Sequence, residues 1–217
     1  IEQNGMRDRI TVIHDLIENV QLPEKVDVII SEWMGFYLVH ESMLDSVLVA
    51  RDKWLKSDGV MYPSSAHIYA SPCNMSALFE QKVNYWGDVY GLDFSPIAPY
   101  ATEKLLSKPY IDHLEAEQLL SDRVLLKKID IKTVTIAELH SIRSQATFTI
   151  KKSGILQGFC IWFDVVFEGS EETVVLDTAP GIPSTHWKQT VLLLPEHFEI
   201  SEGLELPAIF SIESDSH

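Results

Sequence analysis

The spacing of hydrophobic residues divides the chain into a short part with strand–helix–strand alternation and a longer part rich in strands. A strand is predicted at residues 10–13, and Val26–Ile30 is nearly continuous in Val and Ile, which is typical of a strand covered on both faces. From His40 the pattern predicts a helix that ends by Gly59, followed by a short strand. Because two or three strands do not form a stable open α/β sheet, we expect the N-terminal part of this domain to be missing from the sequence.

After Pro63 the pattern changes. Residues 74–91 predict a helix with one apolar stripe, and a stretch punctuated by proline follows. From Val124 onward apolar and polar residues alternate, and the apolar residues of 159–167 share one face of a strand. Strands at this spacing are typical of an antiparallel barrel or sandwich. The sequence therefore predicts a truncated α/β piece, a helical excursion and a β domain.

The charge of the chain favours basic partners. Its 32 acidic and 17 basic side chains give a net charge of −15, which repels nucleic acid and anionic membranes and attracts cations, although solubility alone explains the charge equally well. Because of this charge, we expect no direct nucleic-acid partner. We also expect no membrane partner, because no apolar run approaches the length of a membrane helix. The two cysteines, Cys73 and Cys160, are far apart in the sequence, which favours a reducing compartment and buried, inert thiols.

Two glutamates bracket an aromatic loop in the stretch SEWMGFYLVHESML, residues 31–44. Glu32 directly follows the apolar strand, and Glu41 stands near the start of the next helix. Ligands of open α/β sheets bind beyond the carboxyl ends of the strands, and Gly35 permits a tight bend. We therefore expect both acids to face one cleft, although a structural role, such as stabilising a helix N-terminus, explains each acid taken singly.

Paired carboxylates suit three kinds of chemistry. Glycoside hydrolysis uses one as acid and the other as base. A metal site is the weakest option, because no two of the eight histidines lie three or four residues apart. An arginine side chain fits best, because its planar guanidinium offers five donors that carboxylates meet bidentately. We therefore expect no metal and a basic substrate.

Three stretches of the chain resemble the protein arginine methyltransferases. SEWMGFYLVHESMLDSV at 31–47 resembles the double-glutamate loop of that family, STHWKQTV at 184–191 its threonine–histidine–tryptophan loop, and YWGDVYG at 85–91 part of its dimerisation arm. The Trp-Met-Gly form of the first motif is similar to the type I branch. The resemblance implies the C-terminal part of a Rossmann-like methyltransferase domain (residues 1–62), followed by a β-barrel substrate domain (63–217) with a helical dimerisation arm at about 74–110.

The resemblance also implies roles for residues on the substrate side of the site. Glu32 and Glu41 would hold the guanidinium of a substrate arginine, and His186 would be the loop histidine, acting on a proton or only orienting an acid. Met34 would lie near the methyl-transfer centre, and Trp187 would line the arginine cleft. Two carboxylates would localise charge on some guanidinium nitrogens and aim another at the methyl group, a proximity effect of up to ~7–11 kcal/mol.

On the cofactor side the resemblance implies S-adenosylmethionine. Glu18 would match the acid that binds the adenine amino group, with Ile17 beside it and Met43 near the adenine. The glycine-rich cofactor loop of the family is absent from these residues. We therefore expect the 217-residue chain alone to be inactive, and the intact protein to bind the cofactor and turn over.

The family resemblance implies a function and partners for the intact protein. It would methylate arginine ω-nitrogens of histones or Arg-Gly-rich proteins, giving monomethyl and asymmetric dimethyl arginine, as a homodimer in the nucleus, the cytoplasm or both. Two other readings stay open. One is a non-catalytic dimerising adaptor or coregulator of the same fold, and the other is an unrelated carboxylate hydrolase. An intact glycine-rich cofactor loop upstream would argue against the adaptor, and the lack of a sugar-sized cleft would exclude the hydrolase.

Overall fold

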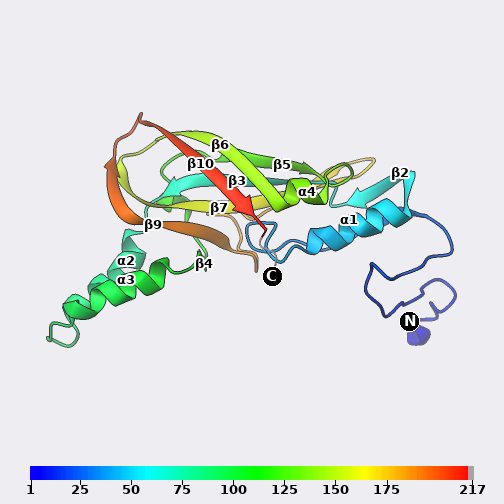
Figure 1. Cartoon of the computed structure of the whole chain (residues 1–217), viewed down its shortest axis with the longest axis horizontal. Coiled ribbons are helices and arrows are strands. Elements are labelled where there is room, and N and C mark those ends of the chain that lie inside the picture. The colour runs from blue at the N-terminus through cyan, green and yellow to red at the C-terminus, as the bar shows by residue number, and fades with distance from the viewer. Residues whose placement is uncertain (215–217) are drawn as a thin grey trace.

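The computed structural model describes residues 1–214, and an antiparallel sheet of six strands forms its body (Figure 1). The strands of this sheet are β3 (Ser65–Cys73), β4 (Tyr110–Asp112), β5 (Val124–Asp130), β7 (Gly154–Glu168), β8 (Thr173–Asp177) and β9 (Gln189–Ile200). Their order is β4-β9-β7-β3-β5, and β8 pairs with β7. Strands β6 (Ser141–Thr149) and β10 (Glu205–Glu213) form a separate antiparallel pair with an unbroken register. The β-rich second part predicted from the alternation is thus confirmed.

The long strand β7 contributes to two hydrophobic cores. The apolar residues at alternate positions from 159 to 167 all belong to, or pack against, the main core between the two sheets, as predicted. Phe148 of β6 and Phe210 of β10 close this core from the other side. On the opposite face of β7, Cys160 and Trp162 lie in a second core. Since side chains alternate along a strand, one element supplies both interiors.

A helical arm projects from the sheet (Figure 1). It consists of α2 (Ser76–Lys82), the 3₁₀ turns η2 (Asn84–Gly87) and η3 (Ser95–Ile97), and α3 (Ala98–Leu106). The prediction of one helix across 74–91 was wrong, because α2 ends at Lys82 and the chain continues as a 3₁₀ turn. The poor helix formers Val83, Asn84 and Gly87 lie at this break.

The two ends of the arm differ in burial. Leu78 and Phe79, at its root, are each 7% exposed and pack in the second core. Tyr90 and Tyr100, farther out, are 99% and 72% exposed. The apolar stripe predicted for the arm is therefore divided between the chain's own core at the root and the solvent at the tip.

The N-terminal part contains one parallel strand pair. Strands β1 (Val26–Ile30) and β2 (Leu55–Tyr62) pair in parallel, and α1 (Met43–Trp54) connects them. The strand predicted at 10–13 was wrong: this stretch is irregular, and Val12 is 75% exposed. Within residues 1–214, β1 is not covered on both faces, because Ile30 is 76% exposed. Apolar residues favour a strand only where a neighbouring strand supplies hydrogen bonds, and residues 1–214 supply no such strand to residues 10–13.

Helix α1 is shorter than predicted at both ends. It begins at Met43 because Glu41 and Ser42 are left-handed, with φ angles of 77° and 54°. It ends at Trp54, and Gly59 lies inside β2 rather than at the helix end. A Cβ at Gly59 would be 3.0 Å from a backbone oxygen of β1, so this glycine allows β1 and β2 to approach closely. Among the helices of residues 1–214, none is long and apolar enough to cross a membrane.

Candidate functional site

The loop between β1 and α1 is tightly folded. Gly35 and Leu38 exchange two backbone hydrogen bonds of 3.0 Å. A Cβ at Gly35 would lie 2.0 Å from the backbone oxygen of His40, so only glycine fits there. Four non-glycine residues of this loop have positive φ angles between 43° and 77°: Tyr37, Leu38, Glu41 and Ser42. Conformations of this kind cost energy and persist where the surrounding structure holds them.

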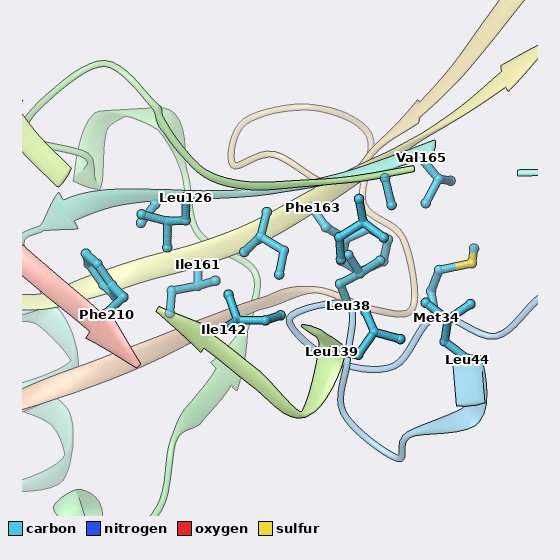
Figure 2. Packing of buried hydrophobic residues seen from close by; sticks show 14 of the residues in the cluster. Met34, Leu38, Leu44, Leu126, Leu139, Ile142, Ile161, Phe163, Val165 and Phe210 are labelled. Carbon is cyan, nitrogen blue, oxygen red and sulfur yellow. The ribbon is translucent and has the colours of Figure 1, made fainter. Parts of the chain in front are cut away.

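Apolar side chains anchor this loop in the main core. Leu38 is fully buried, and Trp33 and Met34 are 2% and 8% exposed. Figure 2 shows Met34 and Leu38 beside Phe163 and Val165 of β7. Burial of these side chains fixes the loop on the sheet and determines where its polar residues emerge.

A second loop, residues 184–188, is joined to the first through Trp187. The indole of Trp187 is 8% exposed and its Nε1 donates a 2.7 Å hydrogen bond to the backbone oxygen of Met34. Its ring meets that of Phe163 edge-on at 5.6 Å. His186 is exposed, and its ring centroid lies 3.9 Å from that of Trp187. Trp187 thus holds two loops together that lie about 150 residues apart in the sequence.

A cavity of about 340 Å³ opens beside the first loop. Glu41 and Met43 line it, and Glu41 lies 3.7 Å from Nδ1 of His40. Glu32, His186 and Trp187 are not among its lining residues. The structure therefore places Glu41 and Met43 at one cavity, and the common cleft for Glu32 and Glu41 stays a prediction. We call this space the Glu41 cavity.

Glu18 lies against α1, where the cofactor residues were predicted. The hydroxyl of Ser46 donates a 2.5 Å hydrogen bond to Oε1 of Glu18, and Nζ of Lys53 donates to its backbone oxygen at 2.5 Å. The hydrogen bond from Ser46, with a smaller contribution from the charge of Lys53, lowers the pKa of Glu18. Ile17 is half-buried beside it, and Met43, at the start of α1, is 51% exposed.

Sequence reasoning missed two acids and one histidine at the Glu41 cavity. Asp45 of α1 and His140 of α4 (Ile136–His140) are joined by a 2.6 Å contact between Oδ2 and Nε2, and Glu213 of β10 also lines the cavity. The spacing of four residues between Glu41 and Asp45 was a usable signal. No local signal pointed to His140 or Glu213, which come from a helix and a strand far away in the sequence. Within residues 1–214, no cluster of three or more His, Cys, Asp or Glu side chains could hold a metal ion.

Comparison with known proteins supports these motifs. Residues 64–217 match the family model of the arginine methyltransferase oligomerization subdomain. The chain is 43% identical over 206 residues to protein arginine N-methyltransferase 2 of Xenopus tropicalis, covering 94% of this chain and 48% of that protein. It is 37% identical over 216 residues to protein arginine N-methyltransferase 6 of Danio rerio, covering 98% of this chain and 62% of that protein.

A solved structure shows the same fold. The chain superposes with a TM-score of 0.84 and 34% identity on a chain of the Trypanosoma brucei PRMT1 enzyme–prozyme heterotetramer, solved with AdoHcy. The match covers 96% of this chain and 64% of that one. The chain thus spans about half to two thirds of the length of these relatives. The match of the oligomerization subdomain to most of the chain, together with these likenesses, shows that the chain belongs to the protein arginine methyltransferase family.

Proposed function

We propose that the chain forms the substrate-holding and subunit-pairing part of a type I protein arginine N-methyltransferase. The full protein transfers methyl groups to arginine ω-nitrogens, giving monomethyl and asymmetric dimethyl arginine. The observation that carries the proposal is the 2.7 Å hydrogen bond between Trp187 and Met34, because it joins the two loops whose sequences are typical of the family. A loop of strained backbone held in this way is a preorganised platform for a substrate.

The proposed mechanism assigns the substrate to carboxylates. Glu32 and Glu41 accept hydrogen bonds from the guanidinium and leave one ω-nitrogen with more lone-pair character. His186, exposed beside Trp187, accepts a proton from the product or orients an acid through a hydrogen bond. Trp187 acts through Met34 as a positioning residue, since it is buried beneath the loop.

The methyl donor proposed for the full protein is S-adenosylmethionine, which supplies an electrophilic methyl group when bound. The AdoHcy in the trypanosomal structure supports this donor. Glu18, with Ile17 and Met43, would hold the adenine. The residues fit this role, because the carboxylate of Glu18 is only half-buried and is an acceptor of the kind that an amino group needs. We expect the chain alone to bind the donor weakly, because its residues contain no glycine-rich turn that follows a strand.

The proposed assembly is a homodimer. We place the boundary between the cofactor domain and the barrel at residues 62 and 63, with the arm at about 74–110 carrying the contact. The matched oligomerization subdomain and the exposed aromatic residues at the tip of the arm, such as Tyr90 and Tyr100, support this assignment. Histones and Arg-Gly-rich proteins in the nucleus or cytoplasm are the proposed substrates.

Transfer of labelled methyl groups tests the proposal. A full-length protein that contains this chain is incubated with methyl-labelled S-adenosylmethionine and an Arg-Gly-rich peptide. We expect label in monomethyl and asymmetric dimethyl arginine, with Glu32→Gln reducing it at least ~100-fold, as is usual when a preorganised charged group is removed. Glu168→Gln, an exposed acid of β7, is the control variant. No label with the unaltered protein would favour a non-catalytic dimerising module.

A further inference from the structure

Helix α1 is fixed to the barrel through one of its faces. Leu44 and Leu48 of this face are buried in the main core, and Arg51 belongs to the same face because side chains three or four positions apart align along a helix. The side chain of Arg51 is only 10% exposed. Its Nη1 donates hydrogen bonds of 2.9 Å and 2.7 Å to the backbone oxygens of Ile131 and Val134. One charged nitrogen thus binds two carbonyl groups of the segment that joins β5 to α4.

A second polar contact joins the same helix to the barrel. Oδ2 of Asp45 lies 2.6 Å from Nε2 of His140, the last residue of α4. Asp45 and Arg51 are separated by roughly 9 Å along the helix axis, at ~1.5 Å per residue. Two contacts at this spacing oppose both sliding and rotation of α1 on the barrel. The Arg51 contact is the more buried of the two, since 43% of the side chain of His140 is exposed.

The opposite face of α1 holds Glu18. The hydroxyl of Ser46 donates a hydrogen bond to the carboxylate of Glu18, and Nζ of Lys53 donates one to its backbone oxygen. At about 100° per residue, Ser46 and Lys53 both point about 180° away from Leu44. Because the helix is one rigid element, a shift of α1 on the barrel also moves Glu18 relative to the barrel.

We propose that Arg51 is a positioning residue that fixes the methyl donor relative to the target arginine. The inference rests on the proposed function, in which Glu18 holds the adenine and the loop of residues 31–42 holds the guanidinium. Leu38 anchors that loop in the main core, so the loop stays with the barrel. Methyl transfer needs the reacting atoms ~3–3.5 Å apart and in line, and a misplacement of ~1 Å costs about 100-fold in rate. Loss of the Arg51 contact would therefore slow the transfer and leave the binding of each ligand intact.

Steady-state kinetics of a full-length protein that contains this chain test the inference. Arg51→Met keeps the apolar stem and removes the donors, whereas Arg51→Lys keeps one charged nitrogen for the two carbonyl groups. We expect Arg51→Met to lower kcat about 10- to 100-fold and to leave KM for S-adenosylmethionine and for an Arg-Gly-rich peptide unchanged. Arg51→Lys should restore most of the loss. Asp52→Asn is the control, because it removes the exposed partner of the arginine Nε, 2.8 Å away, and leaves Nη1 in place.

A distance measurement tests the same contact without relying on activity. Spin labels are attached to Ser57→Cys in β2, which directly follows α1, and to Gln145→Cys in β6, with exposed cysteines elsewhere in the full-length protein replaced. Both positions are exposed, and the native Cys73 and Cys160 are buried. We expect pulsed electron–electron double resonance to give a broader distance distribution for Arg51→Met than for the unaltered protein or for Asp52→Asn.

The two experiments separate the possible outcomes. An unchanged distance distribution in Arg51→Met, or equal effects of Arg51→Met and Asp52→Asn, would overturn the inference. A lower melting temperature of Arg51→Met with a normal kcat would also overturn it, because Arg51 would then contribute to stability alone. If the unaltered protein transfers no label while the distribution still broadens in Arg51→Met, the proposed function is wrong and the role of Arg51 in holding α1 on the barrel remains.

Discussion

Replacement of Trp187 by phenylalanine tests the contact that holds the two site loops together. The substitution keeps an aromatic ring beside Phe163 and removes the donor of the 2.7 Å hydrogen bond to Met34. The indole is 8% exposed, so water does not readily replace the lost donor. An unpaired buried carbonyl costs about 1–3 kcal/mol. For a chain of this length, this corresponds to a melting temperature lower by about 2–12 °C.

The control for this variant is Trp162→Phe. Trp162 is 2% exposed and is packed against Tyr69, but its Nε1 has no hydrogen-bond partner among residues 1–214. Both variants lose the same ring atoms, and only the variant at 187 loses a hydrogen bond. Urea denaturation should therefore give a lower midpoint for Trp187→Phe than for Trp162→Phe, with equal slopes.

Hydrogen exchange locates the effect within the protein. In Trp187→Phe, backbone amides of residues 33–40 should exchange faster than in the unaltered chain, while those of β5 and β6 should not change. In Trp162→Phe the loop should keep its normal rate. If both variants show the same urea midpoint and the same loop exchange, the bond between the loops contributes nothing, and the positioning role of Trp187 is wrong.

Four further predictions concern other parts of the molecule. Gly35→Ala should lower the free energy of unfolding by about 1–3 kcal/mol through overpacking. Gly87→Ala should leave this free energy unchanged, because no atom lies within 4 Å of the new Cβ. Equal melting temperatures of the two variants would contradict the prediction. Burial raises the pKa of Cys73 to about 12 and that of the other cysteine above its usual range, so neither thiol should react with a disulfide reagent at pH 8 before unfolding. Thiols of the unfolded chain ionise near ~8.5. The stability that the buried, protonated thiols contribute is therefore full below that pH and is lost as the pH rises toward about 12. Denaturation measured across this pH range would show the loss. Tyr90→Glu combined with Leu92→Asp, at the exposed tip of the arm, should give a folded monomer in sedimentation, and a persistent dimer would place the contact elsewhere.

The position of the arm variants follows from burial that the sequence did not reveal. The apolar stripe from Leu78 to Tyr90 is compatible with folding back or with binding a partner, and the structure buries its root in the chain's own core and leaves its tip exposed. Leu78 packs in the chain's own core, so an aspartate there would unfold the root of the arm rather than test pairing. Tyr90, which is 99% exposed, is the informative position.

The alternation of apolar and polar residues predicted those strands in which one face packs against a single core along the strand. The alternation over 159–167 was sufficient because every second residue there, all of them apolar, meets the same core. The two motif loops were recognisable as short continuous stretches. The strand at 10–13 failed, since strand formation depends on a neighbour that local sequence does not specify. The pairing of Asp45 with His140, which are 95 residues apart, depends on how α4 and α1 meet in space.

Strand β7 has a consequence for how the molecule tolerates change. Its alternate side chains belong to two interiors, one beneath the site loop and one beneath the arm. A bulkier replacement at Phe163 would press on Trp187, and a small one at Trp162 would leave a cavity in the core that holds the root of the arm. Because the backbone of β7 is shared by both cores, a change in the packing of one core also shifts side chains of the other. The core beneath the loop of residues 31–42 and the core beneath the arm should therefore melt together, in a single transition.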